Sequence, residues 1–108
     1  PDIILGDVYG KSCDPSITSL IENILRKQGY NILRNKFYSG GFCTRNYGRP
    51  TENMHAIQIE INRSLYIDET SYIKKNNFKK IKTDISDLIR ELSNNQLSLN
   101  LRYNSAAE

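Results

Sequence analysis

The stretch DPSITSLIENILRKQG, residues 14–29, carries the strongest secondary-structure signal of the chain. Its apolar residues recur at intervals of three and four, which places them on one face of an α-helix. They are Ile17, Leu20, Ile21, Ile24 and Leu25. Asp14 is a favourable N-cap, Pro15 suits the first helical position, and Gly29 supplies the left-handed residue after the last turn. The stretch predicts a helix with one face for a core.

Apolar segments flank this helix. Residues 3–5, closed by Gly6, and residues 31–35 are typical of short buried strands. Residues 55–62 (HAIQIEIN) alternate as a strand does, and a second amphipathic helix is expected at about residues 78–93. Strands that alternate with helices predict an α/β fold, with a mostly parallel or mixed sheet flanked by helices. We expect the strand at 55–62 to be central.

The length of 108 residues suits a single small domain. In the tail, residues 94–108, the alternation of Leu97, Leu99 and Leu101 predicts an added edge strand, followed by a frayed end. The chain starts at Pro1 and its only methionine is Met54, so we expect a piece of a longer protein. It has no long apolar run and no signal-peptide pattern, so we expect a cytoplasmic protein without membrane contact.

The strand at 55–62 has an unusual polar face. Ile57, Ile59 and Ile61 point to one side, whereas Gln58, Glu60 and Asn62 point to the other. Burial of an unpaired carboxylate is costly. Glu60 is therefore either paired, for example with Arg63, or faces water or a ligand at the carboxyl end of its strand.

The glycine-rich stretch FYSGGFCTRNYGRP, residues 37–50, is expected to be a loop. It contains Arg45 and Arg49, and arginine binds carboxylates through two parallel hydrogen bonds. Tyr47 can help to position a small substrate. Together with Glu60, these side chains indicate a site for an anionic small molecule.

Two other features of the sequence contain residue types that form sites. Cys13 and Cys43 have no metal-ligand spacing, and His55 is the only histidine, so two reduced thiols are expected. Five lysines lie within residues 74–82 without an acidic residue among them. A solvated helix start is the favoured interpretation, and a basic module that binds nucleic acid stays open as the alternative.

Two segments carry a resemblance to a known family. The run YSGGFCTRNYGRPTENMHAIQIEINRSLYIDE, residues 38–69, resembles the carboxy-terminal signature of the N-formylglutamate amidohydrolase family. The opening PDIILGDVYGKSCDP, residues 1–15, resembles the segment that precedes it. The resemblance covers most of residues 1–92, and its specificity comes from the order of GG, TRxYGRP and HAxQxEINRxLYxDE.

The resemblance implies a partial zinc-carboxypeptidase-like (phosphorylase/hydrolase-like) fold. It also implies hydrolysis of N-formylglutamate to formate and glutamate in histidine degradation. Glu60 matches the general base of the family. Arg45, Arg49, Asn62 and Arg63 match positions expected to recognise the carboxylates of a small anionic N-acyl amino acid.

The chain departs from the family in its metal ligands. A catalytic zinc ion usually takes three protein ligands, which His55 alone cannot supply. The resemblance places the ligands in an amino-terminal part. We therefore expect residues 1–108 to be the carboxy-terminal portion of a single amidohydrolase domain, which needs the missing amino-terminal portion as its partner. An inactive remnant of the hydrolase is the further alternative.

Overall fold

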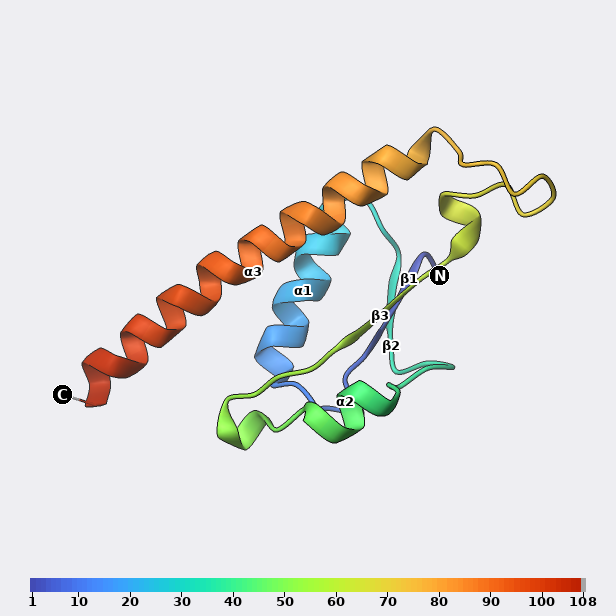
Figure 1. The fold of residues 1–108 in the computed structure, drawn as a ribbon. Coiled ribbons are helices and arrows are strands. Elements are labelled where there is room, and N and C mark those ends of the chain that lie inside the picture. The colour runs from blue at the N-terminus through green and yellow to red at the C-terminus, as the bar shows by residue number, and fades with distance from the viewer. Residues whose placement is uncertain (108) are drawn as a thin grey trace.

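The computed structural model shows an α/β fold with a mixed three-stranded sheet and two long helices on one of its faces (Figure 1). The structure describes the backbone of residues 1–107 and the side chains of residues 1–94. The strands are β1 (Ile3–Gly6), β2 (Ile32–Arg34) and β3 (Gln58–Ile61). The helices are α1 (Pro15–Lys27), α2 (Phe42–Tyr47) and α3 (Asn77–Ala107), with short 3-10 helices at Pro50–Glu52 and Arg63–Leu65.

Helix α1 begins and ends where its sequence predicts. The Asp14 side chain accepts a hydrogen bond from the Ser16 backbone N–H at 2.8 Å and caps the first turn. Gly29 has a φ of 101°, the left-handed conformation that the sequence indicates for the residue after the helix. The predicted helix is therefore confirmed.

The order of the strands is β2-β1-β3, so the prediction of a central strand at 55–62 is wrong. The central strand is β1, which pairs in parallel with β2 and antiparallel with β3. All four residues of β1 are buried, whereas β3 is only half-buried along its length. A strand that is apolar on both faces loses least in the middle of a sheet, and one that carries Gln58 and Glu60 is tolerated at the edge.

One face of the sheet forms the core with the two long helices. Ile3 and Leu5 are in this core, and their partners in β3, Ile61 and Ile59, pack against it. Helix α1 contributes Ile21, Ile24 and Leu25, and α3 contributes Ile81 and Leu88. The predicted cover of two amphipathic helices is confirmed, but Ile89, expected on the apolar side, is 59% exposed.

Two other expectations are corrected. The stretch 37–50 is not entirely a loop, because it contains α2. Thr44 favours this short helix, since its Oγ1 accepts from the Gly41 N–H at 2.9 Å and donates to the Gly41 carbonyl at 3.0 Å. The edge strand expected at residues 97–101 is wrong, because α3 continues through them. The side chains of 95–108 lie outside the described residues, and the frayed tail stays a prediction.

Within the described part of the chain, no helix is both long and apolar enough to cross a membrane.

Candidate functional site

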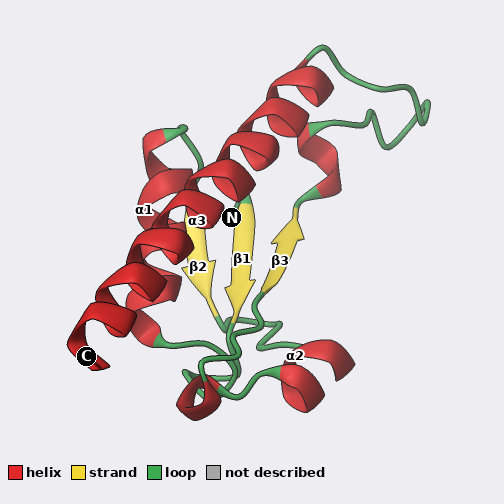
Figure 2. Cartoon of the chain, turned by 60° about the vertical axis from the view of Figure 1, so that its left-hand side comes forward, coloured by secondary structure: helices red, strands yellow, loops and turns green. Residues whose placement is uncertain are grey.

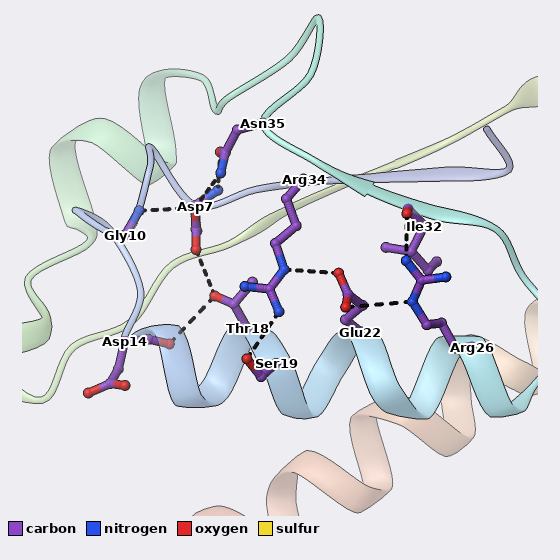
Figure 3. Close-up of polar contacts among 10 residues, drawn as sticks. All are labelled: Asp7, Gly10, Asp14, Thr18, Ser19, Glu22, Arg26, Ile32, Arg34 and Asn35. Atoms are coloured by element: carbon purple, nitrogen blue, oxygen red, sulfur yellow. Dashed lines mark hydrogen bonds and ion pairs between the residues drawn. The ribbon is translucent and has the colours of Figure 1, made fainter.

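Asp7 organises the edge of the sheet where β1 and β2 end (Figure 3). Its side chain is 3% exposed and accepts three hydrogen bonds. The donors are Asn35 Nδ2 at 2.8 Å, Thr18 Oγ1 at 2.9 Å and the Gly10 N–H at 3.0 Å. The carboxylate thus ties the end of β1 to the end of β2 and to α1. Open α/β sheets bind their ligands at this kind of edge.

These hydrogen bonds also favour the ionised form of the Asp7 carboxyl. Burial on its own raises the pKa of the Asp7 carboxyl, but the hydrogen bonds from Asn35, Thr18 and Gly10 outweigh burial and hold the pKa below its usual range. The turn that follows is strained, because Val8 and Tyr9 have φ values of 52° and 54°. An ionised Asp7 therefore acts as the anchor of a strained turn.

Glu60 lies on the sheet face that the helices leave open. It lines a cleft of about 290 Å³ together with Pro1, Asp2, Ile4, Phe37, Tyr38, Ile61 and Asn62. Gln58 Nε2 donates a hydrogen bond to Glu60 Oε1. A Cβ added to Gly41 would lie 3.2 Å from Gln58 Oε1, so the backbone at Gly41 passes close to the Gln58 amide. Gln58 is thereby placed to orient the Glu60 carboxylate.

Arg45, on α2, lines a different cavity of about 190 Å³. Its Nη2 donates to Ser39 Oγ at 3.1 Å. Ser39 follows Tyr38, which lines the Glu60 cleft. The short segment 38–39 thus links the two cavities.

The other predicted substrate-binding residues have partners of their own. Arg49 lies 3.7 Å from Glu52, and Arg63 lies 3.7 Å from Glu69, in exposed ion pairs. Among the described residues, Arg63 therefore pairs with Glu69 rather than with Glu60.

Asn62 and Tyr47 take up different positions. Asn62 Oδ1 caps the 3-10 helix Arg63–Leu65 by accepting from the Ser64 N–H and hydroxyl, and its side chain also lines the Glu60 cleft. Tyr47 is 59% exposed and makes an edge contact with Phe42. The structure thus brings Asn62 to Glu60 and leaves Tyr47 on the outer surface of α2.

The sequence indicates one site for Glu60, Arg45 and Arg49 at the carboxyl end of the Glu60 strand, but Glu60 and Arg45 line different cavities. Because β3 is antiparallel to β1, its carboxyl end lies beside Asp2, whose carbonyl accepts from the Asn62 N–H at 2.8 Å. Helix α2 lies at the opposite end of β3, where β1 ends (Figure 2). The roles of the individual residues stay predictions.

Residues 1–94 do not fit a zinc ion, because they contain no cluster of three or more His, Cys, Asp or Glu side chains that could hold a metal. His55 is engaged in local contacts. Its Nδ1 accepts from the Asp14 N–H at 3.0 Å, and its Nε2 lies 3.2 Å from Asn53 Oδ1. Cys13 is buried and Cys43 is exposed, and both are free. Burial raises the pKa of the Cys13 thiol, the opposite of what a nucleophile needs.

Three lysines of the basic cluster at 74–82 are used within the molecule. Lys80 Nζ lies 2.6 Å from Asp84 Oδ2, and Lys75 Nζ donates to the Ser64 carbonyl at 2.6 Å. Lys74 lies over the Phe78 ring at 4.4 Å. These contacts favour the structural interpretation of the cluster over a nucleic-acid surface.

Sequence reasoning missed Asp7, Asn35 and Lys11 at the carboxyl edge of the sheet. A usable signal was present for Asp7, because an acidic residue directly after a buried strand lies where α/β sheets bind ligands. No local pattern marks Asn35 or Lys11, because Asn35 bonds to Asp7 across 28 positions and Lys11 lines a cavity with Thr44, Arg45 and Gly48 only in the folded chain.

Comparison with known proteins gives a consistent result. The family model for N-formylglutamate amidohydrolase matches residues 1–67. An N-formylglutamate deformylase of Pseudomonas aeruginosa is 39% identical over 70 residues, which are 64% of this chain and 26% of that protein. An N-formylglutamate deformylase of Pseudomonas putida is 38% identical over 71 residues, which are 65% of this chain and 27% of that protein.

A solved structure extends the likeness to the fold. The crystal structure of N-formylglutamate amidohydrolase from Ralstonia eutropha JMP134 superimposes with a TM-score of 0.81 at 34% identity. The match covers 86% of this chain and 33% of that structure. The chain therefore spans about a quarter of the length of the curated relatives and a third of the solved one.

Proposed function

Because the chain belongs to the N-formylglutamate amidohydrolase family, we propose that it takes part in hydrolysing the N-acyl amide bond of an acidic amino acid, with N-formylglutamate as the substrate. The observation that carries the proposal is the family match over residues 1–67, which includes a half-buried Glu60 in an open cleft. The relatives that match are named for this substrate.

Glu60 is the proposed general base. A carboxylate in such a cleft accepts a proton from the attacking water and passes it to the departing amine. The hydrogen bond from Gln58 supports this role, since it fixes the direction of one carboxylate oxygen. Tyr38 and Asn62 on the cleft wall are near enough to contact a substrate that reaches Glu60.

The carboxylates of the substrate are the proposed partners of Arg45, Arg49 and Arg63, with Tyr47 and Asn62 as neutral contacts. Arg45 has the best support, because no carboxylate pairs with it among residues 1–94. Arg49 and Arg63 would have to exchange Glu52 and Glu69 for the substrate.

Zinc dependence, a zinc-carboxypeptidase-like fold for the complete enzyme and a place in histidine degradation belong to the proposal as well. Since the described residues do not fit a zinc ion, the ligands would come from a further portion of the enzyme outside this chain. We therefore expect residues 1–108 alone to bind zinc weakly and to release no formate.

The test is the Glu60→Gln variant of the complete enzyme. A carboxamide keeps the shape of the side chain but cannot accept the proton, so formate release should fall by about 10²–10⁴ while the zinc content stays constant. Asp87→Asn is the matched control, because Asp87 lies on α3 in an ion pair with Arg90. Full activity in Glu60→Gln would remove Glu60 from the mechanism, and a loss of zinc would make it a ligand.

A further inference from the structure

The cavity beside Arg45 contains a second cation, Lys11. It lies near the edge where β1 and β2 end and has a volume of about 190 Å³. Its walls are Val8, Lys11, Ser12, Thr44, Arg45 and Gly48. Two positive side chains thus line one small cavity near the edge of the sheet at which open α/β folds bind their ligands.

Neither cation has a carboxylate partner among residues 1–94. Every other arginine in that range forms an ion pair, namely Arg26, Arg34, Arg49, Arg63 and Arg90. Arg45 instead contacts the neutral Ser39 hydroxyl. Two cations close together repel each other, and an anion between them converts that repulsion into attraction.

The walls of the cavity are built by contacts within the chain. Ser12 Oγ donates to the Ala56 carbonyl at 2.8 Å, and Thr44 Oγ1 donates to the Gly41 carbonyl at 3.0 Å. A Cβ on Gly48 would lie 2.5 Å from the Ser12 carbonyl oxygen, so these two segments touch through their backbones. Both wall hydroxyls are already used as donors, which leaves the cations to meet an incoming anion.

We infer that Lys11 and Arg45 together bind a carboxylate of the N-acyl amino acid, which makes Lys11 a substrate-specificity residue. This inference rests on the proposed function. The segment 38–39 adjoins both this cavity and the Glu60 cleft, because Ser39 contacts Arg45 and Tyr38 lines the cleft.

The experiment is a titration of the 108-residue chain with N-formyl-L-glutamate, followed by backbone amide NMR signals. Saturable shifts should appear at residues 8–12 and 44–48. Lys11→Ala should weaken binding about three- to tenfold, as for a partly exposed charge-assisted contact, and Lys11→Arg should restore it. Lys82→Ala is the matched control, since Lys82 is an exposed lysine on α3. The amide spectrum of each variant checks that it is folded.

Two further probes identify the ligand chemistry. The diester of N-formylglutamate, which has no free carboxylate, should not bind, and inorganic phosphate should bind more weakly than the dicarboxylate. The inference is overturned if Lys11→Ala matches Lys82→Ala, if the diester binds equally well, if phosphate binds as tightly, or if no saturable binding occurs. The measurement is of binding without turnover, so its failure leaves the Glu60 test intact.

Discussion

At the scale of single residues, Asp7 shows how one buried charge orders the edge of the sheet where β1 and β2 end. It orders the turn that leads to Lys11, because its carboxylate holds Gly10 and its carbonyl accepts from the Ser12 N–H at 3.0 Å. The sequence shows which residues carry charges, and on that basis it indicates Glu60 and Arg45. It does not show which residues surround a charge, since the side-chain donors to Asp7 lie 11 and 28 positions away.

Asp7→Asn should therefore destabilise the fold. An amide nitrogen in place of one oxygen would face an N–H or O–H donor, at a cost of about 1–3 kcal/mol for the disrupted buried group. Because the folded-state pKa lies below the ordinary value of 3.8, the stabilisation is fully present above that pH and is lost as pH falls through the folded pKa. Urea unfolding of both proteins between about pH 6 and pH 3 should show the difference narrowing at the acidic end. A difference that does not change with pH would contradict this account.

At the scale of elements, a polar network of Tyr30, Lys80 and Asp84 fastens α3 to the end of α1. The Tyr30 hydroxyl donates to Asp84 Oδ2 at 2.5 Å, and Lys80 Nζ lies 4.6 Å from the centre of the Tyr30 ring. The existence of both helices could be predicted from their apolar periodicity, which is a local signal. The contact that attaches α3 to the end of α1 could not be predicted, because residues 30 and 84 are 54 positions apart. Helix α2 was also not predicted, because the glycines that flank it indicate a loop.

Tyr30→Phe should remove the hydroxyl of this network and leave the ring in place. Loss of a hydrogen bond to a charged group costs about 1.5–3 kcal/mol. Tyr72→Phe is the matched control, since Tyr72 is 76% exposed, and it should change stability by less than about 0.5 kcal/mol. Equal unfolding midpoints in urea for the two variants would show that the network adds nothing to the attachment of α3.

At the scale of the whole molecule, the direction of one strand decides which residues meet. The alternation of residues 55–62 predicts a strand and its apolar face; the strand forms only over Gln58–Ile61, and its apolar face is confirmed in β3. Nothing in that alternation specifies whether the strand runs parallel or antiparallel to β1, because the choice depends on long-range pairing. In the structure β3 is an edge strand that pairs antiparallel with β1, and Glu60 and Arg45 line different cavities. Residue types alone therefore do not specify which of these side chains share a cavity.

The single core shared by the sheet, α1 and α3 leads to a last prediction. Leu88 on α3 is 1% exposed, and its neighbour Ile89 is 59% exposed. Leu88→Ala should cost about 2–5 kcal/mol through lost burial and the cavity left behind. That is a large fraction of the roughly 5–15 kcal/mol that stabilises a typical domain, whereas Ile89→Ala should cost less than about 1 kcal/mol. Urea unfolding followed by both far-UV circular dichroism and tyrosine fluorescence measures the two variants. If α3 belongs to one cooperative unit, the Leu88→Ala midpoint falls equally in both signals, because loss of one helix contact then unfolds the sheet as well. A shift confined to the circular dichroism signal would mean that α3 unfolds separately from the sheet.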